Sequence, residues 1–140
     1  MPGSMKLKLL RVRESTGVMI KSPADIEALF KEEALADREC MWILHINTVG
    51  EVIEKELVAM GLLDQSLVHP REIFKKAILN SAAAIITVHN HPGGSLEPSG
   101  DDKRVWERLV SAGELLGIEV TDNLIVSRFG YYSWKAHKPT

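Results

Sequence analysis

The sequence predicts a single α/β domain in which helices flank a mixed central sheet. Short apolar segments with strand character alternate with amphipathic segments of helical period along most of the 140 residues. Several neighbouring strand segments are separated by only a few residues, which indicates hairpins and therefore some antiparallel pairing. A hydrophobic fraction of 45% and a charged fraction of 26% are ordinary for a globular domain of this length.

The first 60 residues are expected to hold three strands and one helix. Residues 6–14 alternate basic and apolar side chains, as an edge strand with one charged face does. A helix is expected over residues 22–34, with Ser22 as its N-cap and a proline in the first helical position. Residues 40–60 predict two strands joined by a turn near Gly50.

The remainder is expected to contain two helices and three strands. Helices are predicted over residues 69–80 and 99–117, and the apolar residues 81–89 between them suit a central strand covered on both faces. Residues 118–127 and 131–134 complete the chain as strands. Helical spacing assigns these side chains to the buried helix faces: Ile73, Phe74, Ala77, Ile78, Val105, Trp106, Leu109, Val110 and Leu116.

Charge and cysteine content narrow the classes of partner and compartment. The net charge of −2, from 17 basic and 19 acidic residues, gives no overall attraction to nucleic acid or to anionic membranes. No apolar run approaches the ~20 residues that span a bilayer, and no signal peptide is expected. The single cysteine, Cys40, cannot form an internal disulfide, which favours a reducing cytoplasm. Residues 1–4 resemble a cloning remnant, so one domain is expected over residues 5–140.

Residues 89–102, HNHPGGSLEPSGDD, combine metal-ligating residue types with a tight turn. His89 and His91 are two positions apart at a strand end, so both side chains point to the same side, with Cα atoms about 6.5 Å apart. The prolines and glycines that follow reverse the chain and bring Asp102 back toward the histidines. Two histidines, a carboxylate and a water make a catalytic zinc set, in which the ion lowers the pKa of the water to ~7.

The same stretch has two other interpretations. Ser99 and Asp102 fit the S-x-x-D pattern of a helix N-terminus, where Ser99 caps the helix and the acidic side chain meets the positive end of its dipole. Capping and metal binding are compatible, because a cap also holds a ligand rigidly. Two histidines and a carboxylate also form the facial triad of non-haem iron sites, although that triad commonly sits in an all-β barrel. Asn90 and Asp101 are expected to take no part in metal binding.

Three other residues have structural interpretations beside functional ones. His69 precedes a proline at a helix start, which favours a role in starting the helix over contact with substrate. His45 shares its strand face with apolar residues and is expected to be a buried histidine with hydrogen-bond partners, not a third metal ligand. Cys40 is expected to act as a small buried hydrophobe.

Four residues fit a signature of H-x-H, seven residues, S, two residues and D: His89, His91, Ser99 and Asp102. This spacing resembles the JAMM (MPN-plus) metalloproteases. The flanking words VHPREIFKKAILNSAAAIITVHNHP and AGELLGIEVTDNLIV resemble the RadC-like branch, whose members carry the labels DNA repair protein RadC and UPF0758. The resemblance covers about residues 22–134. It implies an α/β/α sandwich with a mixed, curved central sheet of the cytidine deaminase-like, JAMM/MPN type.

The resemblance also implies an activity, that of a zinc-dependent hydrolase acting on a peptide or isopeptide-like amide. Carried over by position, His89, His91 and Asp102 match the zinc ligands. Ser99 matches the serine that assists the oxyanion. Glu39, which precedes the first core strand, matches the general base. A zinc-activated water would attack the amide carbonyl while the base accepts its proton.

Several alternatives stay open beside this implied activity. Glu56 is the second candidate for the base, and Asp101 is the second candidate for the carboxylate ligand. Family members often read HPSGDPTPS where this chain reads HPGGSLEPS, so the loop length is kept while its chemistry differs. Full-length members often carry an N-terminal helix-hairpin-helix region associated with DNA, and none is expected here.

A second function, from another class, is that of a binding module, because MPN domains without the metal signature serve as scaffolds. The chain would then be a non-catalytic RadC-like module that binds a partner in DNA repair or DNA processing. An edge strand near Met60 or Tyr132 would suit addition of an extended peptide. The sequence leaves the substrate, direct binding to DNA and the oligomeric state open.

Overall fold

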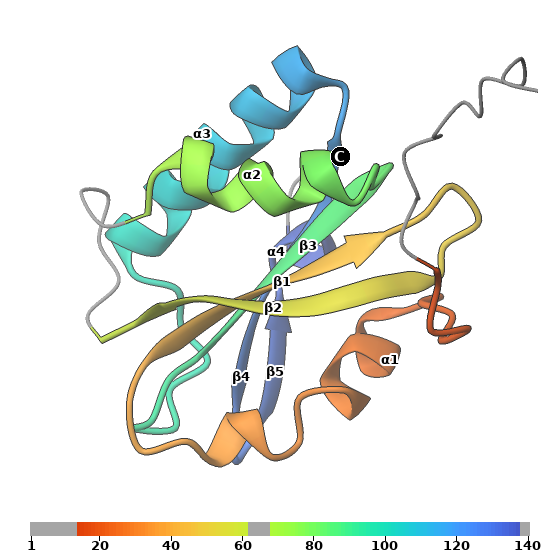
Figure 1. The fold of residues 1–140 in the computed structure, drawn as a ribbon. Helices are drawn as coiled ribbons and strands as arrows, with labels where there is room; N and C mark the ends of the chain where they lie inside the picture. Colours follow the sequence, from red (N-terminus) through yellow and green to blue (C-terminus); the bar gives the residue numbers. More distant parts are fainter. Residues whose placement is uncertain (1–13, 62–67, 138–140) are drawn as a thin grey trace, which may run out of the picture.

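Five strands form one mixed sheet in the order β2-β1-β3-β4-β5 (Figure 1). The computed structural model describes residues 14–61 and 68–137. Its strands are β1 (Cys40–Ile46), β2 (Val52–Met60), β3 (Ala84–Asn90), β4 (Glu119–Ser127) and β5 (Gly130–Ser133). β3 and β4 are parallel, and the other three neighbouring pairs are antiparallel. The predicted mixed sheet is therefore confirmed.

Helices cover both faces of this sheet, as the predicted α/β/α sandwich requires. They are α1 (Pro23–Ala28), the short 3-10 helix η1 (Glu33–Leu35), α2 (Pro70–Leu79), α3 (Gly100–Leu116) and α4 (Trp134–His137). Figure 1 shows α2 and α3 side by side over one face and α1 over the other. Within the described residues, no helix is both long and apolar enough to cross a bilayer.

The core lies in two layers because side chains alternate along the central strands. β1 and β3 are buried along their whole length, as strands covered on both faces must be. On β1, Met41 and Ile43 pack against α2 and α3, while Trp42 and Leu44 pack toward Phe30 and the α1 side. This alternation also decides which side chains at the end of β3 face each layer.

The pairing of β1 with β3 brings two distant parts of the sequence together. The two strands are antiparallel, with Met41 opposite His89, so the start of β1 lies beside the end of β3. Beyond β3, the His91 N–H donates to the Val126 carbonyl at 3.1 Å, and the chain then turns back toward α3. The β1 start, the β3 end and the α3 start therefore meet at one edge of the sheet.

Several predicted boundaries are wrong by a few residues. The helix expected over residues 22–34 ends at Ala28, and only a 3-10 turn follows at Glu33–Leu35. The strand expected from Ser81 starts at Ala84, because Ser81 has a φ of +53° and turns the chain. Trp134 begins α4 instead of extending the last strand. There the Asp122 carboxylate accepts the Lys135 N–H at 3.0 Å and stabilises a helical turn.

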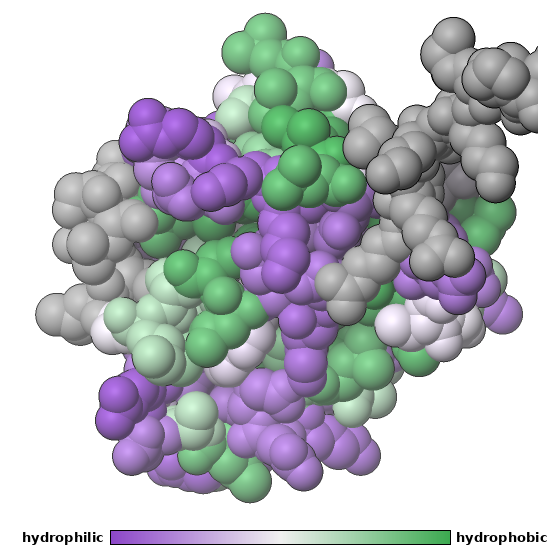
Figure 2. Space-filling model, viewed as in Figure 1, coloured by the Kyte–Doolittle hydropathy of each residue, from purple (hydrophilic) through white to green (hydrophobic). Residues whose placement is uncertain are grey.

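Two helix residues expected in the core are on the surface. Ile78 is 54% exposed and Leu116 is 50% exposed, although the remaining assigned side chains on α2 and α3 are buried or partly buried. Figure 2 shows hydrophobic surface over this pair of helices, where Leu79 and Leu115 are also exposed. The apolar stripe is wider than the contact with the sheet, so its outer margin faces solvent. The expected remnant at residues 1–4 and the expected strand at 6–14 lie, apart from Glu14, outside the described residues, and Glu14 is in no strand.

Candidate metal centre

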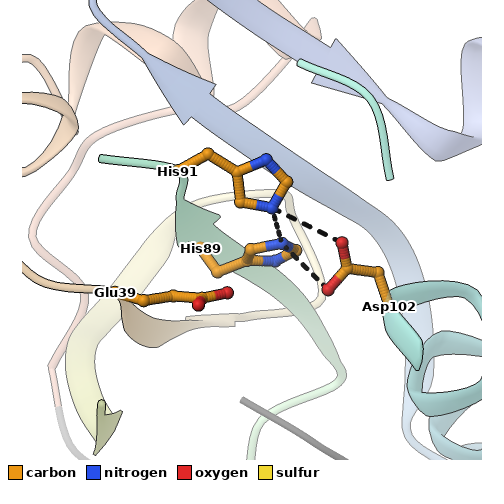
Figure 3. A group of neighbouring side chains, drawn as sticks. All are labelled: Glu39, His89, His91 and Asp102. Atoms are coloured by element: carbon orange, nitrogen blue, oxygen red, sulfur yellow. Dashed lines mark hydrogen bonds and ion pairs between the residues drawn. The ribbon is translucent and has the colours of Figure 1, made fainter. Parts of the chain in front are cut away.

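Four side chains from three separate segments converge where these strands and α3 meet (Figure 3). His89 lies on β3, His91 just beyond it, Asp102 in the first turn of α3, and Glu39 immediately before β1. One ligand atom from each side chain lies within 4.8 Å of the others. His89 and Asp102 are buried, and Glu39 and His91 are partly exposed. The site is therefore buried on the side of His89 and Asp102 and partly exposed on the side of Glu39 and His91.

The distances among the three predicted ligands match a tetrahedral ion. His89 Nε2 lies 3.1 Å from His91 Nε2 and 3.3 Å from Asp102 Oδ1. His91 Nε2 lies 3.4 Å from Asp102 Oδ2. Zinc–ligand bonds of about 2.0–2.1 Å at tetrahedral angles place neighbouring ligand atoms about 3.3 Å apart. The two distances to Asp102 reach different carboxylate oxygens, so the two histidines and the carboxylate lie close enough together to hold a zinc ion.

His91 is held in the tautomer that a metal ligand needs. Its Nδ1 lies 2.9 Å from the Ser95 carbonyl oxygen, which can only accept a hydrogen bond. The proton of neutral His91 is therefore on Nδ1, and the lone pair of Nε2 faces His89 and Asp102. Ser95 was not predicted to contribute to the site, because a backbone carbonyl leaves no trace in residue identity.

Asp102 combines the two roles that the sequence left open. The Ser99 hydroxyl accepts the Asp102 N–H at 3.0 Å, and the Asp102 carboxylate accepts the Ser99 N–H at 2.9 Å. This reciprocal capping box starts α3 and fixes the carboxylate in front of both histidines. Asp101, its alternative, is half exposed and forms an ion pair with Arg104 on the surface. The choice of Asp102 over Asp101 therefore agrees with the geometry.

The group perturbs the acidity of its members. Burial would raise the pKa of Asp102, but hydrogen bonds from His89, His91 and the Ser99 N–H outweigh it and hold this pKa well below its usual range. The hydrogen bond to Asp102 raises the pKa of His91, and burial offsets part of that effect. The Asp102 carboxylate therefore stabilises a proton on His91 Nε2 in the protein without metal, and a metal ion would have to replace that proton.

Glu39 faces the three predicted ligands without pairing to them (Figure 3). Burial raises the pKa of Glu39, while the nearby His89 and His91 lower it. Among the described residues, its carboxylate accepts no hydrogen bond, which suits a group that takes a proton from a bound water. Glu56, the other candidate base, instead hydrogen-bonds to His45 Nε2 at 2.9 Å and does not belong to the group.

The turn between the histidines and α3 is covered by the β4–β5 turn. A Cβ at Gly94 would lie 2.7 Å from the Phe129 ring, and Gly94 has a φ of +93°, so only glycine fits this contact. Arg128 donates to the Pro92 carbonyl at 3.3 Å and stacks over Phe129. These contacts anchor Pro92 and Gly94, two positions at which the chain keeps the sequence usual in the family, and sequence patterns did not indicate them.

The other residues with two interpretations have structural roles. The His69 side chain caps α2 by accepting the Arg71 N–H at 3.1 Å. His45 is fully buried and both of its ring nitrogens have partners. Cys40 is buried with a free thiol, and burial raises its pKa. Large surface hollows lie elsewhere, for example one of about 500 Å³ between α2 and α3, so donor chemistry and not volume distinguishes this site.

Comparison with known proteins gives the family. A family model described as "RadC-like JAB domain" matches residues 20–139. The chain is similar to a "UPF0758 protein" of Rubrobacter xylanophilus, with 48% identity over 120 residues, covering 85% of this chain and 52% of the relative. It is also similar to a "UPF0758 protein" of Alkaliphilus metalliredigens, with 50% identity over 117 residues, covering 83% of this chain and 50% of the relative.

These relatives carry names that state no activity. A third, the "UPF0758 protein" of Desulforamulus reducens, is 41% identical over 130 residues, covering 92% of this chain and 57% of the relative. The chain thus spans about half the length of the curated relatives it matches. The family model covers most of the chain, including all four residues of the candidate metal centre. This chain belongs to the RadC-like JAB domain family.

Proposed function

We propose that this domain is a zinc-dependent hydrolase that cleaves a peptide or isopeptide-like amide. The observation that carries the proposal is the convergence of Glu39, His89, His91 and Asp102 within 4.8 Å at one open edge of the sheet. Membership of a JAB domain family supports a hydrolase of this general kind. The candidate ligands are two imidazoles and one carboxylate, which is a common protein set for catalytic zinc.

Zinc, when bound, would supply a water acidified to a pKa of ~7 and a positive charge that polarises the substrate carbonyl. His89 and Asp102 would hold the ion from the buried side, and His91 from the partly exposed side. Water and substrate would reach the ion from the partly exposed side, where Glu39 and His91 lie. The distances of 3.1 to 3.4 Å between the histidine nitrogens and from them to the Asp102 oxygens support zinc binding by these three side chains.

Glu39 is proposed as the general base. Its carboxylate would accept a proton from the attacking water and deliver that proton to the leaving nitrogen of the amide. Its place beside the ligands, outside their hydrogen bonds, supports this role. Ser99 is proposed to donate its hydroxyl proton to the developing oxyanion, because its oxygen already accepts the Asp102 N–H and its orientation is thereby fixed.

The decisive experiment compares two glutamate variants. Zinc-loaded protein is screened against fluorogenic peptides and lysine-isopeptide conjugates, and turnover is measured for wild type, Glu39→Gln and Glu56→Gln. Glu39→Gln is expected to lower kcat by about 10²- to 10⁴-fold with zinc still bound. Glu56→Gln is the matched control, since it changes a nearby glutamate outside the group, and should alter kcat by less than about fivefold. Unchanged turnover in Glu39→Gln would remove Glu39 as the base.

Two other experimental results would favour a different function. Elemental analysis of protein purified without added metal separates zinc from iron, and stoichiometric iron would favour the facial-triad alternative. A partner complex that survives both a chelator and His89→Ala, together with no hydrolysis across the panel, would favour the non-catalytic module. The DNA-related role belongs to that second outcome.

A further inference from the structure

Asn90 lies between the two histidines, but its side chain points to the opposite face of the sheet. Alternation along the strand end sends His89 toward the metal group and Asn90 into the other layer. Asn90 is fully buried, with an exposed fraction of 0%. A buried amide requires hydrogen-bond partners, because an unpaired one is costly to bury. The identity of those partners indicates its role.

The side chain of Asn90 binds the backbone on both sides of Glu39. Its Oδ1 accepts the N–H of Cys40 at 2.7 Å. Its Nδ2 donates to the carbonyl of Arg38 at 2.9 Å. The carbonyl of Glu39 itself accepts the Gly61 N–H at 2.8 Å. The backbone of Glu39 is thus held from two sides, and Asn90 provides one of them.

Pairing of β1 with β3 does not reach Glu39, although pairing of β1 with β2 extends to Cys40 opposite Met60. β1 begins at Cys40, and its pairing with β3 includes Met41 opposite His89 but stops there. Beyond that pair the backbone of His91 turns away to bond Val126 on β4. The Asn90 side chain accepts the Cys40 N–H at the place where a backbone hydrogen bond would continue the β1–β3 ladder. On the β3 side, the Asn90 side chain therefore provides the bonds that link the residues flanking Glu39 to the strand end that carries His89.

An amide of this length is well suited to the contact. It must accept from one backbone group and donate to another at the same time, and an asparagine amide does both in a fixed plane. An aspartate would keep the acceptor and lose the donor. Alanine would lose both and would leave the buried Cys40 N–H without a partner.

We propose that Asn90 is a positioning residue that ties the general base to the metal ligands. Because it sits on the same strand end as His89 and holds the residues flanking Glu39, ligands and base keep one geometry when substrate binds. The inference rests on the proposed role of Glu39 as the base. Its consequence is that loss of the Asn90 amide displaces Glu39 while leaving the ligands in place.

The test compares Asn90→Ala with Asn80→Ala in the full chain. Asn80 is the matched control because it is also a buried asparagine with side-chain partners, but it binds His45 and Glu54 away from Glu39. Three quantities are measured: the zinc dissociation constant, amide hydrogen exchange along β1 in zinc-loaded protein, and the position of the Glu39 carboxylate in zinc-loaded crystals.

Asn90→Ala is expected to change the zinc dissociation constant by less than about threefold. Exchange of the Cys40 amide should accelerate about tenfold or more relative to Ile43 and Leu44 on the same strand, because only Cys40 loses its partner. The Glu39 carboxylate should shift by about 1 Å, a displacement large enough to impair proton transfer. Asn80→Ala should leave the Cys40-to-Ile43 exchange ratio and the carboxylate position unchanged.

Three results would overturn the proposal. These are equal acceleration of exchange along all of β1, an unmoved Glu39 carboxylate, or a loss of zinc as large as that of His89→Ala. If Asn90→Ala does not fold, Asn90→Ser keeps a hydroxyl that can accept from Cys40 and is expected to show the same changes at reduced size. A wild type that binds no zinc would refute the proposed function. Amide hydrogen exchange at Cys40 in zinc-free protein would still test whether Asn90 holds the backbone beside Glu39.

Discussion

Two histidine–carboxylate clusters lie on the same sheet, and of these two only the first could hold a metal ion. The first is the candidate metal centre of Glu39, His89, His91 and Asp102. The second, here called the His45 network, consists of His45, Glu54, Glu56, Lys76 and Asn80. Both clusters combine histidine with carboxylates, but the His45 network has one histidine instead of two, and its side chains differ in direction and pairing.

The His45 network is closed. The Asn80 amide nitrogen donates to Glu54 at 2.9 Å and faces His45 Nδ1 at 3.0 Å, so Nδ1 must be the acceptor. The proton of His45 is then on Nε2, which donates to Glu56 at 2.9 Å. Lys76 pairs with Glu54 at 2.7 Å. Both ring nitrogens are used, and no lone pair faces a second ligand.

The metal centre has the opposite arrangement. The proton of neutral His91 is on Nδ1, bonded to the Ser95 carbonyl, and the Nε2 lone pair faces His89 and Asp102. Glu39 stands beside these groups outside their hydrogen bonds. In each cluster, the hydrogen-bond partner of one ring nitrogen decides whether the other ring nitrogen carries a lone pair or a proton. A carbonyl behind the ring directs the lone pair inward, whereas an amide donor behind the ring directs a proton inward.

The largest expected difference between the clusters is in zinc affinity. His89→Ala removes a ligand and should weaken zinc binding by more than about 100-fold, since loss of a supporting partner alone costs 10- to 100-fold. His45→Ala should change affinity by less than about threefold. Competition with a chromophoric chelator measures both. Equal weakening by the two variants would mean that the clusters are not functionally distinct.

The next difference is in folding stability. His45→Ala should lower the free energy of unfolding by about 2–3 kcal/mol, because the partly buried Glu56 carboxylate and the buried Asn80 amide each lose a hydrogen-bond partner. Zinc should not restore this loss. By contrast, saturating zinc at 100 times its dissociation constant should stabilise wild type by about 2.7 kcal/mol and His89→Ala by far less. Urea unfolding of the three proteins with and without zinc gives all six free energies of unfolding.

A smaller effect is expected at the start of α3. Ser99→Ala removes the N-cap of α3 and should cost about 1 kcal/mol of unfolding free energy in zinc-free protein. Asp101→Ala, two residues away, should cost only about 0.3 kcal/mol, because its ion pair with Arg104 is exposed. Thermal unfolding of zinc-free protein measures the pair. A Ser99→Ala cost no larger than that of Asp101→Ala would contradict the capping role.

The smallest effect concerns pH. Because the folded pKa of His91 is raised, its contribution to zinc-free stability is complete below the unfolded value of about 6.5 and is lost as pH rises through the folded value. The difference in unfolding free energy between wild type and His91→Gln should therefore shrink with rising pH, by on the order of 1 kcal/mol or less. Zinc affinity should rise over the same interval, because protons compete for the nitrogen. Parallel slopes would contradict the assigned His91–Asp102 pairing.

Much of the fold and of the ligand set was predictable from local patterns. Helical and strand periods located the elements to within a few residues, with α1 and the start of β3 as the main errors. The H-x-H pair could be assigned to one side because alternation along a strand is local. The return of Asp102 followed from the turn residues and from the capping pattern with Ser99. These features depend on neighbours within about a dozen positions.

The candidate base was not predictable in the same way. Nothing near Glu39 in the chain separates it from Glu56, and only the family resemblance favoured it. The antiparallel pairing of β1 and β3 places Glu39 beside the metal ligands, and pairing with β2 places Glu56 beside His45. Asn90 is expected from the sequence to take no part in metal binding, because its side chain points away from the two histidines. One signal was present, since a polar residue in an otherwise apolar central strand needs a buried partner.

The sequence by itself therefore determined the ligand-bearing elements, because periodicity and turn chemistry act over short stretches of chain. The tertiary structure alone decided which glutamate stands beside the histidines, which ring nitrogen carries each proton, and what Asn90 binds. Those properties depend on strand register between residues about 50 positions apart, as in the bond from Asn90 to Cys40. Register is set by packing of both sheet faces together, and no local pattern contains it.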